Sequence, residues 1–246
     1  MTKFLVTGST GQVGGPAAAA LRAGGADVVG LTRSGGPEAV AADLVTGEGL
    51  TKALTGIDTV VHLAAGNDKR DLPMLRNLTA AAKAAGVGHL VMISIVGCDL
   101  VPLAFYRQKV ELEGIALASG VPLTIQRATQ FHTLIDQVFS VQKFSPAIFA
   151  PAWRFQPIAP EEVGARMAEL AMGAPQVRAE DIGGPHVESV RELHAEWKEA
   201  TGSRRPAVIF RMPGKMSAGF TAGVHLAPAS SFGKQTFAEY LAKKYR

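Results

Sequence analysis

The feature that most constrains the fold is the glycine-rich segment Thr7–Gly14, which directly follows the strand-like apolar run Lys3–Thr7. Glycine at positions 8 and 11 lets the backbone turn sharply with no Cβ in the way, and Gly14 lets a following helix lie close to the strand. The N-terminus of that helix would offer N–H groups and a partial positive charge to an anion. The segment therefore predicts a strand–turn–helix unit whose turn binds phosphate.

Short apolar runs and longer helix-like stretches alternate over the first half of the chain. We expect strands at Lys3–Thr7, Asp27–Thr32, Ala39–Ala42, Thr59–Leu63, His89–Ser94 and Pro122–Arg127. We expect helices at Gly11–Ala23, Leu50–Leu54, Leu72–Ala85 and Phe105–Ser119. Several strands are apolar without alternation, which indicates that both of their faces are covered. The pattern predicts an α/β fold with a doubly wound parallel sheet, of the Rossmann type.

The pattern becomes less regular after Thr129. We expect helices over Leu134–Gln142 and Val190–Ala200 and a helix start at Pro160, with strands near Asp181–Gly183 and at Ala207–Phe210. We interpret residues 1–150 as a dinucleotide-binding Rossmann domain. Residues 151–246 would supply the last sheet elements and a small C-terminal α+β cap that forms the substrate region and does not fold independently.

Composition excludes several classes of protein. The formal charge is +4 and the basic residues are scattered, whereas nucleic-acid binders concentrate them on one stripe. Cys98 is the only cysteine, so no intramolecular disulfide can form. No signal peptide and no apolar run long enough to cross a membrane is visible. We expect a cytoplasmic protein with a small-molecule substrate and with no nucleic-acid or membrane partner; its oligomeric state stays open.

The GxxGxxG spacing after Thr7 resembles that of the short-chain dehydrogenase/reductase superfamily, especially its extended and atypical branches. Other segments are similar to those that surround the cofactor and substrate in that superfamily: Asp43-Leu44, His62-Leu63-Ala64-Ala65-Gly66, Ser94, Lys109 and Gln126-Arg127-Ala128-Thr129-Gln130-Phe131. The chain resembles most the NmrA-like, NAD(P)H-binding group of atypical members. The resemblance is strongest over residues 3–131.

The resemblance implies a set of site residues. A nicotinamide dinucleotide would contact Gly8, Thr10, Gly11, Gln12, Val13, Gly14, Arg33, Ser34, Asp43, Leu44, Leu63, Ala64, Ala65 and Lys109. The substrate would lie near Gln130, Phe131 and His132. For His132, a packed or surface histidine is the alternative.

The end of the second predicted strand favours NADP(H) over NAD(H). An NAD-selective site places a carboxylate there to hold the ribose 2′-hydroxyl, but this strand ends in Thr32-Arg33-Ser34. Its acid, Asp27, stands at the opposite end, roughly 16 Å away at ~3.3 Å per residue. Arg33 can grip a 2′-phosphate with two hydrogen bonds, aided by the Ser34 hydroxyl. We expect NADP(H), with NAD(H) as a possible substitute.

The usual catalytic set of the superfamily is incomplete. In that set a tyrosine, a lysine four residues later and a serine polarise and protonate the substrate carbonyl. If Lys109 is the lysine, the tyrosine position holds Phe105, which has no transferable proton. Tyr106 is displaced by about 100° around the helix. Candidate catalytic residues are Lys109, Tyr106 and Ser94, with Gln130 and His132 as substitute donors.

Three functions fit these observations. The first is an NADPH-dependent oxidoreductase acting on a quinone-like or apolar carbonyl substrate, because a quinone can take its proton from water. The second is a non-catalytic sensor of NADP(H) that signals through a protein partner. The third is a sugar-nucleotide epimerase or dehydratase, although Phe105 replaces the tyrosine it would need. No motif has metal-ligand spacing, so we expect no metal.

Overall fold

The computed structural model describes residues 2–66 and 68–246. The chain divides into two compact units that interleave along the sequence. The first unit comprises the chain up to Ser94 together with Ala104–Arg127 and Pro160–Glu180. The second comprises Ile95–Leu103, Ala128–Ala159 and Asp181–Arg246. The sequence analysis divided the chain once, near residue 150, whereas each compact unit is made of three separate segments. That the second half does not fold alone stays a prediction.

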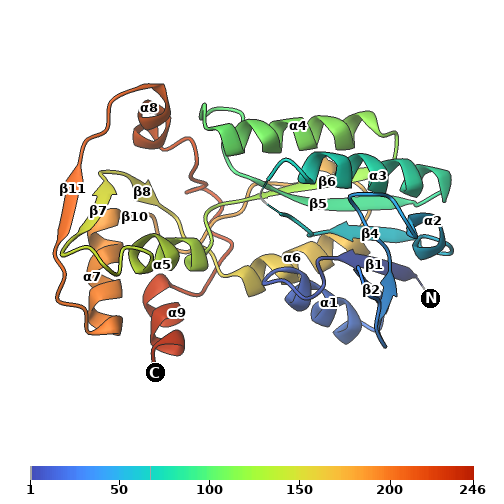
Figure 1. Cartoon of the computed structure of the whole chain (residues 1–246), viewed down its shortest axis with the longest axis horizontal. Coiled ribbons are helices and arrows are strands. Elements are labelled where there is room, and N and C mark those ends of the chain that lie inside the picture. Colours follow the sequence, from blue (N-terminus) through green and yellow to red (C-terminus); the bar gives the residue numbers. More distant parts are fainter. Residues whose placement is uncertain (1, 67) are drawn as a thin grey trace. The chain divides into compact units, whose positions relative to one another are not determined.

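The first unit is built on a seven-stranded parallel sheet (Figure 1). Its strands are β1 (Lys3–Thr7), β2 (Asp27–Thr32), β3 (Ala39–Ala41), β4 (Thr59–His62), β5 (His89–Ile95), β6 (Leu123–Ala128) and β9 (Val177–Arg178). Their order in space is β3-β2-β1-β4-β5-β6-β9. The order reverses between β1 and β4, and ligands of such sheets bind outside the carboxyl ends of the strands at this reversal. The predicted doubly wound Rossmann-type sheet is confirmed.

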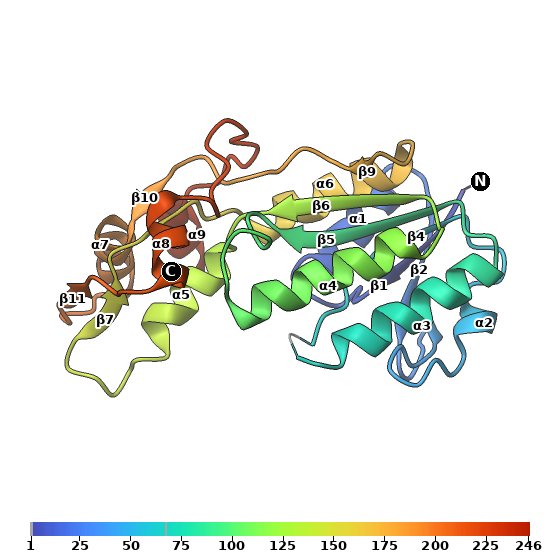
Figure 2. The same cartoon turned by 90° about the horizontal axis from the view of Figure 1, so that it is seen from above.

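Helices cover both faces of this sheet (Figure 2). One face carries α1 (Gly14–Ala23) and α6 (Pro160–Met172), and the other carries α3 (Asp71–Ala84) and α4 (Ala104–Ala118), with the short α2 (Leu50–Ala53) beside α3. The central strands are apolar because both faces are buried: Leu5, Val60 and Leu90 have no exposed surface. Their side chains and those of α2, α3 and α4 form one continuous core.

Glycine permits the close packing of α1 on α6. A Cβ on Gly164 would lie 2.8 Å from the carbonyl oxygen of Val13, 2.9 Å from the nitrogen of Ala17 and 2.7 Å from a side-chain carbon of Pro16. Two of these neighbours are backbone atoms, which move only if the helix moves. The contact therefore fixes α6 against the start of α1.

The second unit contains two small sheets and four helices among its described residues. β7 (Ile148–Pro151) pairs in parallel with β11 (Ala207–Phe210), and β8 (Arg154–Phe155) pairs antiparallel with β10 (Glu188–Ser189). The helices are α5 (His132–Ser140), α7 (Val190–Thr201), α8 (Lys215–Ala222) and α9 (Phe237–Lys244). A separate core that includes Phe139, Trp197 and Phe237 holds α5, α7 and α9 on the first small sheet.

One sequence-based expectation for the sheet is wrong. No strand runs through Asp181–Gly183, where Ile182 and Gly183 form only isolated bridges. The last strand of the large sheet is β9 at Val177–Arg178, and Val177 has a φ of +64°. A β-branched residue rarely adopts this conformation, so no local pattern predicts a strand that begins at Val177. The predicted Ala207–Phe210 strand exists but belongs to the small sheet with β7.

We predict opposite stability effects for two helical glycines. Gly164→Ala should lower the free energy of unfolding by about 1–3 kcal/mol, because its new methyl group meets backbone atoms of α1. Gly114→Ala on α4 should raise it by about 0.5–1 kcal/mol, because a Cβ there meets nothing within 4 Å and alanine favours the helix. Urea denaturation measures both. Equal effects of the two substitutions would refute the proposed α1–α6 constraint.

Candidate cofactor and active site

A buried threonine joins the carboxyl ends of the two central strands. Thr7 Oγ1 accepts hydrogen bonds from the backbone N–H of Leu63 at 3.1 Å and of Ala64 at 3.2 Å, and lies 2.8 Å from His62 Nδ1. Because the oxygen already accepts two bonds, its own proton goes to Nδ1, and neutral His62 carries its proton on Nε2. The sequence places a threonine before the glycines, but it does not reveal that this threonine bonds to the end of β4 where the strand order reverses.

His62 is kept uncharged. Burial first, and then the nearby positive charge of Lys109, lower the pKa of His62 to about 4. The same proximity places the Lys109 ammonium group close to the carboxyl end of β4. Lys109 therefore lies beside the segment after β4 that the resemblance assigns to the cofactor.

The glycine loop has a shape that side chains would destroy. Gly8 has a φ of +66°, and a Cβ on it would lie 2.8–2.9 Å from backbone atoms of Leu63 and Ala64. A Cβ on Gly14 would lie 2.0 Å from the carbonyl oxygen of Gly8. Gly11 donates its N–H to that same oxygen at 2.9 Å. The loop is thus a tight turn that brings bare backbone to the start of α1.

The loop presents this backbone outward. Thr10, Gly11 and Gln12 are exposed, whereas Val13 is buried and anchors the helix start. No side chain caps the N-terminus of α1. The first-turn N–H groups and the helix dipole therefore suit a phosphate anion, and the residues present fit a dinucleotide pyrophosphate.

Arg33 and Ser34 follow the carboxyl end of β2, next to the glycine loop in the sheet. Thr7 of β1 is in register with Leu31 of β2, so both exposed side chains lie just beyond the level of the loop. Asp27 is instead in register with Lys3, at the amino end of the sheet. The only carboxylate of β2 is thus at the far end from the loop, as the strand length predicts.

The loop after β3 is organised by its own aspartate. Asp43 Oδ1 accepts the backbone N–H of Val45 at 2.7 Å and of Thr46 at 3.2 Å. Leu44 is buried in the core, so its side chain faces away from a ligand. Asn77 of α3 holds this loop by donating to the carbonyls of Leu44 and Val45. The sequence did not single out Asn77.

The segment after β4 is progressively more exposed. Leu63 and Ala64 are half-buried and Ala65 is exposed. The N–H groups of the first two point to Thr7, which turns the chain alongside the glycine loop. Gly66 continues this turn by donating its N–H to Asp71 Oδ1 at 2.6 Å.

The positions of the usual tyrosine and lysine lie on α4. Lys109 is buried, and its Nζ lies 5.3 Å from the centre of the Phe105 ring. Tyr106 is 5% exposed and its ring centre is 6.3 Å from that of Phe105. The lysine thus faces an aromatic ring with no hydroxyl at the position where the resemblance would place a tyrosine.

The candidate serine belongs to a buried ionic network. Ser94, at the carboxyl end of β5, hydrogen-bonds to the carboxylate of Glu113. Arg127 grips the same carboxylate with two hydrogen bonds of 2.8 and 2.7 Å, and both side chains are buried. Burial opposes ionisation, but the bonds from Arg127 and Ser94 hold the pKa of Glu113 below its usual value. The sequence signal that could have revealed this network is Glu113, a carboxylate on the side of α4 that packs on the sheet.

The predicted substrate residues lie in the second unit, where two of their side chains are used internally. Gln130 donates to the carbonyl of His225 at 3.1 Å and accepts from the N–H of Gln156 at 3.3 Å. His132 is fully buried, with Nε2 3.1 Å from the carbonyl of Gln235 and burial lowering its pKa to about 4. Phe131 is half-buried. His132 therefore has the environment of a packed histidine.

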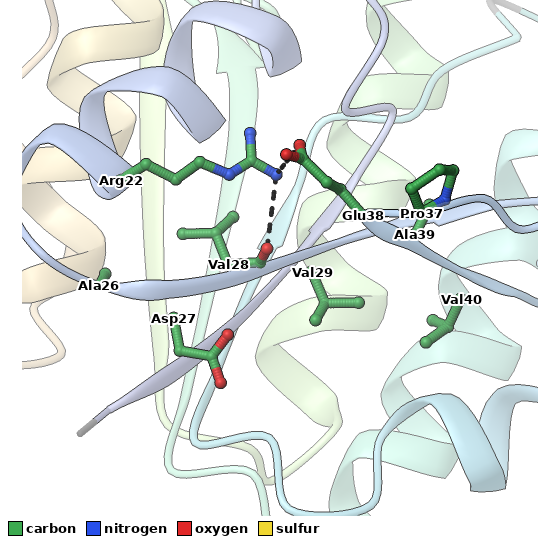
Figure 3. A pocket seen from close by; sticks show the side chains of 9 residues that line it. All are labelled: Arg22, Ala26, Asp27, Val28, Val29, Pro37, Glu38, Ala39 and Val40. Atoms are coloured by element: carbon green, nitrogen blue, oxygen red, sulfur yellow. Dashed lines mark hydrogen bonds and ion pairs between the residues drawn. The ribbon is translucent and has the colours of Figure 1, made fainter.

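A cavity of about 440 Å³ lies at the first residues of β2 and β3 (Figure 3). Its charged walls are Arg22 and Glu38, which pair at 3.0 Å, and Asp27. Arg22 also donates to the carbonyl of Val28. None of the predicted cofactor residues lines it. Its polar groups are already paired, so it is not the site that the glycine loop defines.

Within residues 2–66 and 68–246, no cluster of His, Cys, Asp or Glu side chains could hold a metal ion. Within the same ranges, no helix has the length and apolarity needed to cross a membrane.

The segment that contains the glycine loop is similar to a known family. Residues 8–120 match a family described as NAD(P)H-binding. This segment contains the glycine loop, Arg33, the turn after β4 and Lys109. The match covers less than half of the chain, and together with the doubly wound sheet it supports an NAD(P)H-binding Rossmann domain over this segment. It agrees with the cofactor class that the resemblance to atypical short-chain dehydrogenases/reductases implies.

The proteins similar to this chain include quinone oxidoreductases and a nucleotide-sugar epimerase. Over 78 residues, 32% of this chain and 27% of the relative, the chain is 32% identical to quinone oxidoreductase 2 of Escherichia coli. The match thus spans about a quarter of the length of that curated relative. The structure of the NADPH complex of the E. coli NADPH-dependent quinone oxidoreductase has a TM-score of 0.82 and 18% identity, covering 99% of this chain and 100% of that one. A nucleoside-diphosphate-sugar epimerase from Staphylococcus aureus gives 0.79 and 18%, over 98% and 100%. These structural likenesses show the fold.

We predict that acid destabilises the fold partly through His62. The unfolded chain takes up a proton near the ordinary histidine pKa of 6.5, but the folded state does so only near 4. The unfolded state therefore binds more protons in this window, and the free energy of unfolding falls as the pH drops from about 6.5 to about 4, by up to about 1.4 kcal/mol per pH unit. Denaturation curves across this range measure it. His62→Asn should reduce the loss, whereas His186→Asn, at an exposed histidine, should not; an identical pH dependence for both would contradict the assignment.

Proposed function

We propose that the protein is an NADPH-dependent oxidoreductase that reduces a quinone-like or apolar carbonyl substrate. The observation that carries the proposal is the glycine loop at the sheet reversal, where Thr7, Gly8 and Gly14 shape a cradle of bare backbone. The quinone oxidoreductase relatives support the reaction class and the preference for NADPH.

Each part of the cofactor has a matching group on the first unit. The pyrophosphate would bind the N-terminus of α1 over Gly11–Gly14. The 2′-phosphate would bind Arg33 and Ser34, which are exposed and stand where an NAD-selective site has a carboxylate. The nicotinamide ribose would bind Lys109, whose positive charge lies near the carboxyl end of β4.

The chemistry fits an acceptor that does not depend on a tyrosine. When bound, NADPH supplies a hydride, and the substrate takes up the hydride and one proton to become the reduced product. Phe105 cannot give that proton, and the Ser94 hydroxyl bonds to Glu113. A quinone suits this arrangement because its reduced anion is stable enough to take a proton from water. Lys109 would attract the negative charge that develops on the substrate oxygen.

One observation favours a second function. Phe105 at the tyrosine position and the engagement of Ser94 by Glu113 are also what a protein that binds NADP(H) without turnover would show. Such a protein would report the NADP(H) ratio to a partner. Steady-state assays with NADPH and a panel of quinones and carbonyl compounds distinguish the two functions: NADPH oxidation that depends on the acceptor supports the reductase, and tight binding without oxidation supports the sensor.

We predict that Arg33→Ala weakens NADPH binding by about tenfold or more and barely changes NADH binding. One charge-assisted bidentate contact contributes roughly 1.5–3 kcal/mol, and only NADPH carries the 2′-phosphate. Titration calorimetry with both cofactors measures the difference. Arg191→Ala, at an exposed arginine of α7, serves as the matched control and should change neither affinity. Equal losses for NADPH and NADH in Arg33→Ala would refute the assignment.

We predict that Phe105→Tyr retains whatever quinone-dependent NADPH oxidation the protein has, because that turnover does not depend on a hydroxyl at this position. Tyr106→Phe should also retain it, since the buried ring of Tyr106 lies one residue out of register with the lysine. Steady-state rates and NADPH affinity are measured for both variants. Loss of turnover in Tyr106→Phe with unchanged NADPH affinity would show instead that Tyr106 is the acid.

A further inference from the structure

A group of apolar side chains in the second unit faces solvent. Phe144 is 92% exposed, Val141 64% and Phe149 52%, and Val208 and Phe210 are each above 40%. We call these five residues the apolar surface. Large apolar side chains this exposed, and this close in sequence and register, mark interaction sites more often than isolated exposed residues do.

Contacts link three members of the apolar surface, Val141, Phe149 and Val208. The side chain of Gln142, next to Val141, bonds to both the N–H and the carbonyl oxygen of Phe149. Phe149 on β7 is in register with Val208 on β11, so the two share a face of the small sheet. Figure 2 shows the turn between α5 and β7 extending beyond both elements.

The sheet alternation turns this face away from the core. Ile148 and Ala150 of β7 lie in the core beside Trp197 of α7, and Ile209 of β11 packs against that core. Their neighbours in sequence, Phe149, Val208 and Phe210, therefore point to the opposite face.

The same segments are basic and contain no acid. Neither residues 137–160 nor residues 202–238 include an aspartate or glutamate. Lys143 Nζ lies 5.0 Å from the centre of the Phe144 ring, and Arg205 donates to the carbonyl of Gln142 at 2.6 Å. Arg204 and Arg211 flank β11 and are exposed. The apolar surface is therefore bordered by positive charge alone along these segments.

We propose that the apolar surface docks the protein on an anionic lipid membrane. Apolar side chains that project next to lysine and arginine suit a bilayer interface, which accepts the former among its acyl chains and attracts the latter to its headgroups. A second copy of the chain is disfavoured, because a two-fold axis through this surface would bring the lysines and arginines of these segments face to face, and the segments themselves supply no carboxylate to pair with them.

This inference replaces the expectation of no membrane partner with a surface contact. The sequence analysis did not single out Phe144 or Phe149, because a local pattern does not show whether an aromatic side chain is exposed. The inference does not depend on the proposed enzymatic function.

Co-sedimentation of the full chain with vesicles tests the proposal. The protein should bind vesicles of phosphatidylcholine with phosphatidylglycerol, bind pure phosphatidylcholine much less, and be released by salt. Phe144→Ser should lower the partition coefficient by about tenfold, and Lys143→Gln by about fivefold. Leu117→Ser, at a 55% exposed leucine of α4, is the matched control and should bind like the wild type.

Three outcomes would overturn the proposal. The first is that the wild type does not bind anionic vesicles, and the second is that Phe144→Ser and Leu117→Ser lose vesicle binding equally. The third is that light scattering shows a dimer of the wild type and a monomer of Phe144→Ser, while neither protein binds vesicles. NADPH titration of Phe144→Ser runs in parallel and should match the wild type. Failure of docking is thereby distinguished from failure of the cofactor assignment.

Discussion

The hydrogen bonds of Thr7 Oγ1 are the interaction on which the rest of the site depends. They tie the end of β1 to His62 at the end of β4 and to Leu63 and Ala64 after it, across the point where the strand order reverses. The tie brings the backbone of Leu63 and Ala64 so close to the loop that only glycine fits at position 8. One buried hydroxyl thus couples the topology of the sheet to the shape of the phosphate cradle.

A second buried network sets what chemistry α4 and the neighbouring strands can perform. Glu113 engages both Ser94 and Arg127, and Phe105 places a ring beside Lys109. The strong hydrogen bonds of this network stabilise the interior, because an unpaired carboxylate there would be costly. They also direct the serine hydroxyl toward the carboxylate, which agrees with the proposed reduction of an acceptor that takes its proton from water.

Local patterns predicted the first unit well and the second only in part: α5, α7 and β11 were expected, whereas β7, β8, β10, α8 and α9 were not. Asp27–Thr32 and the glycine loop were found from apolar runs and glycine spacing, because both signals are local. The bond between Ser94 and Glu113 depends on how α4 packs on the sheet, which no local pattern states. In the second unit, α9 went unpredicted although Thr236 and Glu239 form a capping box. Phe237 and Tyr240 of α9 pack against the ring of His132, which lies more than a hundred residues earlier in the chain.

Hydrogen exchange measured by mass spectrometry, with and without NADPH, tests the central claim that the glycine loop is the cofactor site. We expect slower exchange in peptides that cover residues 8–15 and 62–66, because bound pyrophosphate engages the first and the adjoining turn is stabilised with it. Peptides covering β7 and β11 should not change. Saturable NADPH binding without protection of residues 8–15 would refute this assignment and place the cofactor elsewhere.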